Sequence, residues 1–120
     1  MSKKPSEASI EAVIGEPLSG ISFVQDYVEF HFDGKIVRSL TMPTVHLSNV
    51  RHTFPGAGSR DALCSMIGLM VDNVIVREGN EIEIAFSDRA YISIPLGSAA
   101  RSGPEAAHYV PGPNQPIIVW

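Results

Sequence analysis

The feature that most constrains the fold is an internal sequence repeat. The stretch VEFHFDGK, residues 28–35, returns fifty-four positions later as IEIAFSDR, residues 82–89. Upstream, SEASIEAVIG at 6–15 lies over SRDALCSMIG at 59–68 at an offset of 53. Alternating strands resemble one another by composition alone, but a near-constant offset over about 35 positions indicates a chain that is built twice from one plan.

The predicted repeats span residues 6–42 and 59–96, and each begins with a short helix. A serine, Ser6 or Ser59, can cap the start of the helix in each copy. The apolar residues that follow share one helical face, and a glycine can end the helix. We therefore expect two short helices.

The rest of each repeat predicts three strands joined by tight turns. In the second strand of the first copy, Val28, Phe30 and Phe32 alternate with polar residues, which is typical of a strand with one buried face. The third strand is expected to bury one phase of its alternation in each copy. That phase comprises Ile36, Leu40 and Met42 in the first copy and Ala90, Ile92, Ile94 and Leu96 in the second.

The segments outside the repeats complete a single domain of residues 1–120, as the length predicts. Residues 43–58 form a connector with a short extended piece, and residues 105–120 form a C-terminal hairpin around a Pro-Gly-Pro-Asn turn. The predicted fold class is mainly β, or β-rich α+β. We expect a pseudo-two-fold duplicated small barrel or sandwich of about eight short strands with two short helices.

The chain has a doubled unit, Gly-x-x-hydrophobic-x-x-hydrophobic followed by F-x-D/G, and it has the tail GPEAAHYVPG…PIIVW. These two patterns resemble those of a loose group of small bacterial proteins whose function is not known. The resemblance covers most of residues 13–120. It implies a β-rich protein with a doubled strand-hairpin unit, and it implies no activity and no functional residue.

Charge and composition restrict the partners that the chain can take. Nine Lys and Arg against thirteen Asp and Glu give a formal net charge of -4, which argues against binding to nucleic acid and favours a basic partner. No apolar run approaches the roughly 20 residues that span a bilayer, so no membrane association is expected. The lone Cys64 excludes an intramolecular disulfide. The start of the chain lacks the apolar region of a secretory signal, so we expect a cytoplasmic location.

The run FPGAGSRD, residues 54–61, is the most suggestive local motif. Gly56 and Gly58 leave backbone N–H groups accessible, Ser59 can cap a helix, and Arg60 would lie in the first helical turn. Anions bind at helix N-termini through such groups. The alternative is a flexible linker with an ordinary cap, because no Gly-Lys-Ser/Thr of a P-loop follows.

Basic residues gather in one part of the chain. Residues 34–60 contain four of them and no Asp or Glu. The predicted alternation places Arg38 in the buried phase, opposite Ile92 of the other copy, where a charge is costly unless it is paired or solvated. Arg38 is therefore expected either at a barrel mouth or in a ligand or interface pocket, and Arg51 is a second candidate ligand-binding residue.

No catalytic residue, metal ligand or cofactor is predicted. The four histidines and Cys64 lack the spacing of a metal site. A catalytic triad of Ser59, His52 and Asp61 is not predicted, because no Gly-x-Ser-x-Gly elbow surrounds the serine.

The sequence favours a non-enzymatic binding protein over an enzyme. The expected partner is another protein or a second copy in a homodimer, bound through exposed sheet edges or the C-terminal hairpin. One version is a neutralising partner of a basic protein, because acidic charge would speed their encounter. The alternative is a small module for an anionic ligand, or a modest enzyme, that uses the Gly56–Ser59 loop with Arg38, Arg51 or Arg60.

Overall fold

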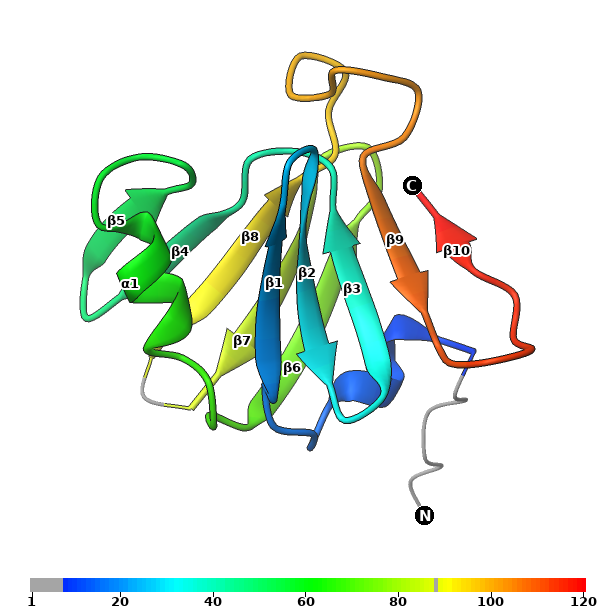
Figure 1. The fold of residues 1–120 in the computed structure, drawn as a ribbon, viewed down its shortest axis with the longest axis horizontal. Coiled ribbons are helices and arrows are strands. Elements are labelled where there is room, and N and C mark those ends of the chain that lie inside the picture. Colours follow the sequence, from blue (N-terminus) through cyan, green and yellow to red (C-terminus); the bar gives the residue numbers. More distant parts are fainter. Residues whose placement is uncertain (1–7, 88) are drawn as a thin grey trace.

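Two antiparallel five-stranded sheets form the protein (Figure 1). The computed structural model describes residues 8–87 and 89–120. In chain order the elements are the 3-10 helix η1 (Ile10–Val13), β1 (Gly20–Val24), β2 (Tyr27–Phe32), β3 (Lys35–Ser39), β4 (Thr44–Leu47), β5 (Val50–Thr53), α1 (Ser59–Cys64), β6 (Val71–Arg77), β7 (Glu81–Phe86), β8 (Tyr91–Pro95), β9 (Ala107–Val110) and β10 (Ile118–Val119). The first sheet has the order β1-β2-β3-β9-β10, and the second has the order β5-β4-β8-β7-β6.

The predicted mainly β class is confirmed, and of the two predicted architectures the chain adopts the sandwich. The sheets lie as two layers with open edges, so they do not close into a barrel (Figure 1). Buried apolar side chains from both sheets join one core cluster, which includes Phe30 and Tyr109 from the first sheet and Ile84 and Ile92 from the second. The described chain holds ten strands where about eight were expected.

The prediction of two helices was wrong, because α1 is the only α-helix among residues 8–87 and 89–120. The first predicted helix is reduced to the four residues of η1, where Ser9 accepts a hydrogen bond from the N–H of Glu11. Gly15, with a φ of 86°, turns the chain away just after it. The expected cap, Ser6, lies outside the described residues.

The two halves of the chain exchange their last strands. The hairpin β4–β5 leaves the first half and pairs with β8, and the hairpin β9–β10 leaves the second half and pairs with β3. The two sheets therefore have equivalent strand orders. In the first, β1-β2-β3 is followed by the hairpin β9-β10. In the second, β6-β7-β8 is followed by the hairpin β4-β5. The expected connector 43–58 therefore contains two strands of the second sheet, joined by a two-residue turn at Ser48–Asn49 whose φ values are positive.

A short reciprocal pairing of backbone lies where the halves meet, around the isolated bridge between Pro17 and Met70. Its four hydrogen bonds run from Gly15 N to Val71 O (2.8 Å), from Gly68 N to Leu18 O (2.8 Å), from Leu18 N to Leu69 O (2.9 Å) and from Val71 N to Glu16 O (3.0 Å). Shifting residue numbers by 53 exchanges the first bond with the second and the third with the fourth. This is the symmetry that a duplicated chain would have, and the repeats 6–42 and 59–96 stay a prediction.

The buried phase predicted for β3 was wrong by one residue. Val37 and Ser39 are buried, whereas Ile36 and Arg38 lie in the opposite phase. The cause is the length of the preceding turn. Asp33–Gly34 provides two residues between β2 and β3, but residues 87–89 provide three between Phe86 and its partner Ala90.

The extra residue shifts the correspondence between the two third strands. Val28 lies opposite Ser39, and Ile82 lies opposite Ile94, so Ser39 corresponds to Ile94. Arg38 therefore corresponds to Ser93 and not to the buried Ile92. The predicted phase of β8 is confirmed, because its inward residues are all buried: Ala90, Ile92, Ile94 and Leu96.

Substitution of the two glycines at the reciprocal pairing is expected to destabilise the fold. Gly15 and Gly68 have φ values of 86° and 99°, and a Cβ there would meet no atom within 4 Å. Gly15→Ala and Gly68→Ala should therefore each cost about 1 kcal/mol through backbone strain alone. Urea unfolding measures the loss. Gly20→Ala, at an equally open position without a positive φ, is the control, and equal effects at all three positions would contradict the strain.

Candidate functional site

The Gly56–Ser59 loop, which was predicted to bind an anion, forms hydrogen bonds within itself. Ser59 is buried, and its hydroxyl donates a hydrogen bond of 2.6 Å to the carbonyl of Gly56. Gly58 caps α1 with a φ of 79° and provides no side-chain cap. A Cβ on Gly56 would lie 2.8 Å from the carbonyl oxygen of Thr53, so tight packing of the turn is enough to require glycine.

Arg60 lies on an aromatic pair beside this loop. The rings of Phe23 and Phe54 stack with their centroids 5.5 Å apart. The guanidinium carbon of Arg60 is 4.9 Å from the centroid of Phe54 and 5.9 Å from that of Phe23. A guanidinium at such distances is attracted to the ring faces. Strands β1 and β5 and helix α1 thus meet at Arg60.

Arg38 and Arg51 lie on different sheets, on β3 and β5. Arg38 belongs to the outward face of the first sheet. Its Nε and Nη2 each lie 2.8 Å from Oε2 of Glu29, and its Nη1 lies 2.9 Å from Nδ1 of His108. Its guanidinium also lies over the ring of Tyr27 at 5.2 Å. The three candidate arginines therefore have three different surroundings, and binding of an anion by the Gly56–Ser59 loop stays a prediction.

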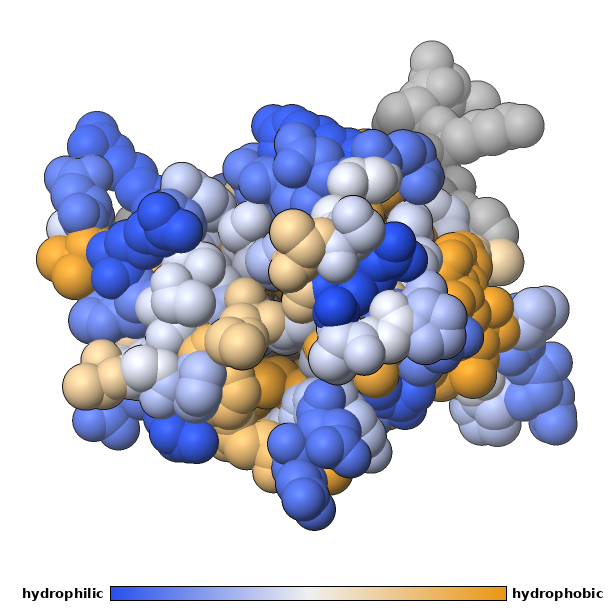
Figure 2. All heavy atoms as spheres, turned by 90° about the horizontal axis from the view of Figure 1, so that it is seen from above, coloured by the Kyte–Doolittle hydropathy of each residue, from blue (hydrophilic) through white to orange (hydrophobic). Residues whose placement is uncertain are grey.

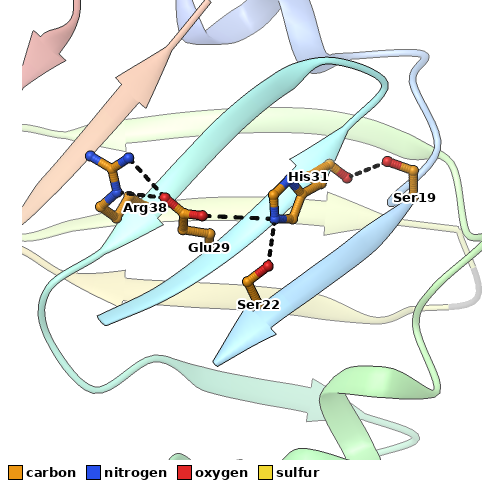
Figure 3. A network of polar contacts seen from close by, with 5 residues as sticks. All are labelled: Ser19, Ser22, Glu29, His31 and Arg38. Carbon is orange, nitrogen blue, oxygen red and sulfur yellow. Dashed lines mark hydrogen bonds and ion pairs between the residues drawn. The ribbon is translucent and has the colours of Figure 1, made fainter. Parts of the chain in front are cut away.

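The contacts of Arg38 continue along the outward face of β1 and β2 (Figure 3). Oε1 of Glu29 lies 3.9 Å from Nε2 of His31, and the same nitrogen lies 2.9 Å from the hydroxyl of Ser22. In a hydrolytic triad the carboxylate binds the other ring nitrogen and orients the imidazole toward the serine. Here the carboxylate and the hydroxyl share one nitrogen, so the geometry is not that of a triad.

Alternation along β2 predicted that Glu29 and His31 point outward, and they do. Their contacts with Arg38 and Ser22 were not predicted. No local sequence pattern could predict the contact of His108 with Arg38, because the two residues are 70 positions apart along the chain. It reaches Arg38 only through the exchange of β9 into the first sheet.

The outward face of the second sheet carries a polar hollow of about 320 Å³. We call it the polar groove, and it is lined by Thr44, His46, Arg51, Asn80, Glu81 and Ser93, with Pro95 beside them. The ring of His46 stacks on that of Tyr91, with centroids 4.1 Å apart. The hydroxyl of Ser93 donates to Oε1 of Glu81 at 3.2 Å. Burial, and then the charge of Arg51, lower the pKa of His46, while Glu81 and Glu83 oppose the shift.

An apolar surface lies at the end of the sandwich where β1 turns into β2. We call it the end patch, and it consists of Phe23, Val24, Met42 and Phe54. Met42 is 61% exposed, Val24 is 41% exposed and Phe23 is 36% exposed. All but Phe23 line a hollow of about 300 Å³. Figure 2 looks onto this end of the molecule and shows hydrophobic surface between hydrophilic side chains.

None of the protein-family models, curated proteins and solved structures compared with the chain matches it. Within residues 8–87 and 89–120, no three His, Cys, Asp or Glu side chains are grouped to hold a metal ion. The described helices are too short to cross a membrane. Function is therefore inferred from the three surfaces described above.

Removal of Arg38 is expected to destabilise the protein. Arg38→Met would leave the carboxylate of Glu29, whose side chain is 15% exposed, without its cation, at a cost of about 1 kcal/mol. The double variant with Glu29→Gln should lose less than the sum of the single losses. Urea unfolding of the four proteins gives the coupling. Arg77→Met, which removes a more exposed ion pair, is the control, and a gain in stability from Arg38→Met would contradict the pairing.

Acid is expected to destabilise the protein through His46. Its folded pKa lies below that of a histidine in the unfolded chain, so the unfolded chain binds more protons as pH falls through about 6.5. The contribution of neutral His46 is thus present above that pH and is lost as pH falls toward the folded pKa. Unfolding at pH 7.5 and at pH 5.5 should show a smaller drop in stability for His46→Gln than for the native protein. Equal drops would contradict the assignment.

Proposed function

We propose that the protein is a non-enzymatic binding module that takes a protein partner at the end patch. The observation that carries the proposal is the exposure of Phe23, Val24 and Met42 in one cluster, of which Val24 and Met42 line a hollow. Contiguous apolar surface on a folded domain is costly in water and marks interaction sites. A hollow within it can accept an apolar side chain of the partner, which is how interface anchors bind.

The chemistry beside the patch indicates what the partner presents. Arg60 lies over Phe54 and Phe23, and its side chain has no ion pair within the described residues. The aromatic pair holds the guanidinium in place, so a carboxylate can bind it at a low cost in side-chain entropy. We therefore propose a partner that places an apolar side chain in the hollow and an acidic group on Arg60.

Two contacts support binding over catalysis. The one contact between a serine hydroxyl and a histidine ring in the described chain, Ser22 with His31, lacks the orientation of a triad. The hydroxyl of Ser59 is already donated to Gly56. This second contact also weakens the alternative of an anion held by the Gly56–Ser59 loop.

The partners expected from composition and from sheet edges rest on less specific features. A basic partner follows from the net charge of -4 alone, and that charge would accelerate encounter without selecting a contact surface. A homodimer through exposed sheet edges would use one of the edge strands β1, β10, β5 and β6. The end patch with Arg60 is more selective than either, because it combines shape, apolar surface and one charge.

Photo-crosslinking followed by binding measurements tests the proposal. A benzophenone amino acid at Met42 should capture one protein in cells, and the same group at Val119, which is also exposed, should not. The captured protein, once purified, should bind the native chain in calorimetry. Phe23→Ser and Arg60→Glu should each weaken that binding about tenfold or more.

Val119→Ser is the control in the calorimetry and should leave the affinity unchanged. Binding that is insensitive to Phe23→Ser and Arg60→Glu would overturn the proposal. So would a crosslink to a second copy of this chain, which would make the end patch a homodimer interface. Circular dichroism of each variant establishes that it is folded.

A further inference from the structure

The outward faces of the two sheets have equivalent rows of cross-strand partners, but the side chains in these rows differ. In the first sheet, Glu29 lies opposite Arg38, which lies opposite His108. In the second sheet, the corresponding row is Glu83, Ser93 and Thr44. The long side chains at the second and third positions of the row are thus replaced by two short ones. The first face is covered by its own polar contacts, and the second is hollowed into the polar groove.

The short side chains leave several polar groups of the groove available to a ligand. No described residue forms an ion pair or hydrogen bond with the guanidinium of Arg51, the ring nitrogens of His46 or the side-chain amide of Asn80. The residues of the groove other than Asn80 project from paired strands, which hold their backbones in defined positions. The unused donors and acceptors around the hollow offer hydrogen bonds to a small polar ligand.

Charges of both signs act within this hollow. Arg51 supplies a cation at one side, and Glu81 supplies a carboxylate. His46 lies directly opposite Arg51 in the pairing of β4 with β5, and the charges of Arg51, Glu81 and Glu83 all act on the pKa of its ring. Glu81 is already bound by Ser93 and by the more exposed Arg77, so its carboxylate is fixed in place but keeps further acceptor capacity.

We propose that the polar groove binds a small zwitterion, an α-amino acid, a dipeptide or another compound with a carboxylate and an ammonium group. The carboxylate of the ligand would bind the guanidinium of Arg51, and its ammonium group would bind Glu81. The hollow of about 320 Å³ accommodates a molecule of this size. The imidazole of His46 and the amide of Asn80 would donate to or accept from the polar atoms between the two charges.

Other ligand classes fit the groove less well. A simple anion would leave the remaining acceptor capacity of Glu81 unused, and a simple cation would be repelled by Arg51. A neutral polyol would give Arg51 no counter-charge, whereas Glu81 already has Arg77. An aromatic ligand would find the Tyr91 ring already covered by His46. A ligand with both charges satisfies both sides of the groove at once.

NMR titration of the full chain tests the proposal with defined probes. The zwitterions are glycine, 4-aminobutyrate and diglycine, which differ in the separation of their charges. Propionate, propylamine and glucose supply the anion, the cation and the polyol alone. Addition of the best zwitterion should shift backbone amides of β4, β5 and β8. Arg51→Gln and Glu81→Gln should each raise its Kd about tenfold or more.

Two further variants sharpen the test. Ser93→Arg places in the groove the side chain that occupies the equivalent position of the first sheet, Arg38, and should abolish the shifts. Arg101→Gln removes an arginine that lines neither the groove nor the hollow of the end patch, and should leave the Kd unchanged. Thermal unfolding of each variant establishes that it is folded.

Several results would overturn the proposal. Propionate, propylamine or glucose binding as tightly as the best zwitterion would reassign the groove to that simpler class. The absence of amide shifts with every probe would remove the site. An unchanged Kd in Arg51→Gln or Glu81→Gln would place the ligand elsewhere. Because the end patch shares no residue with the groove, none of these results bears on the proposed protein partner.

Discussion

The reciprocal pairing of residues 15–18 with residues 68–71 is the constraint on which the rest of the structure depends. Four backbone hydrogen bonds join the two halves at equivalent positions. Beyond this joint, each half gives its last hairpin to the other sheet. Neither half therefore has a complete sheet of its own, and the core contains side chains from both. Such a chain is expected to unfold as one cooperative unit.

The same arrangement explains why the two outward faces differ in what they can do. Equivalent strand pairs place residues in equivalent rows, so a change of side chain alters a face without altering the scaffold. With Arg38 and His108 in the row of the first face, the guanidinium of Arg38 binds Glu29 and His108 of the same face. With Ser93 and Thr44 in the row, the second face is hollow and Arg51 has no ion pair within the described residues.

The end patch arises from chain connections rather than from the sheets themselves. Val24 ends β1 just before the turn into β2, and Met42 lies on the crossing from β3 in one sheet to β4 in the other. Phe54 follows β5 and stacks on Phe23. Apolar residues on such connections cannot all reach the core, because the two layers are already filled by the strands. An exposed apolar surface at one end of the sandwich is the consequence.

Local sequence pattern was sufficient for the class of fold and for the inward residues of β2 and β8, because alternation is a property of neighbours two residues apart. It did not determine the phase of β3, since turns of two and three residues set different registers. It also did not show that residues 43–58 contain two strands or that β9 would bring His108 to Arg38. Those outcomes depend on which sheet edge accepts each hairpin, and that choice is made only when both halves pack around one core.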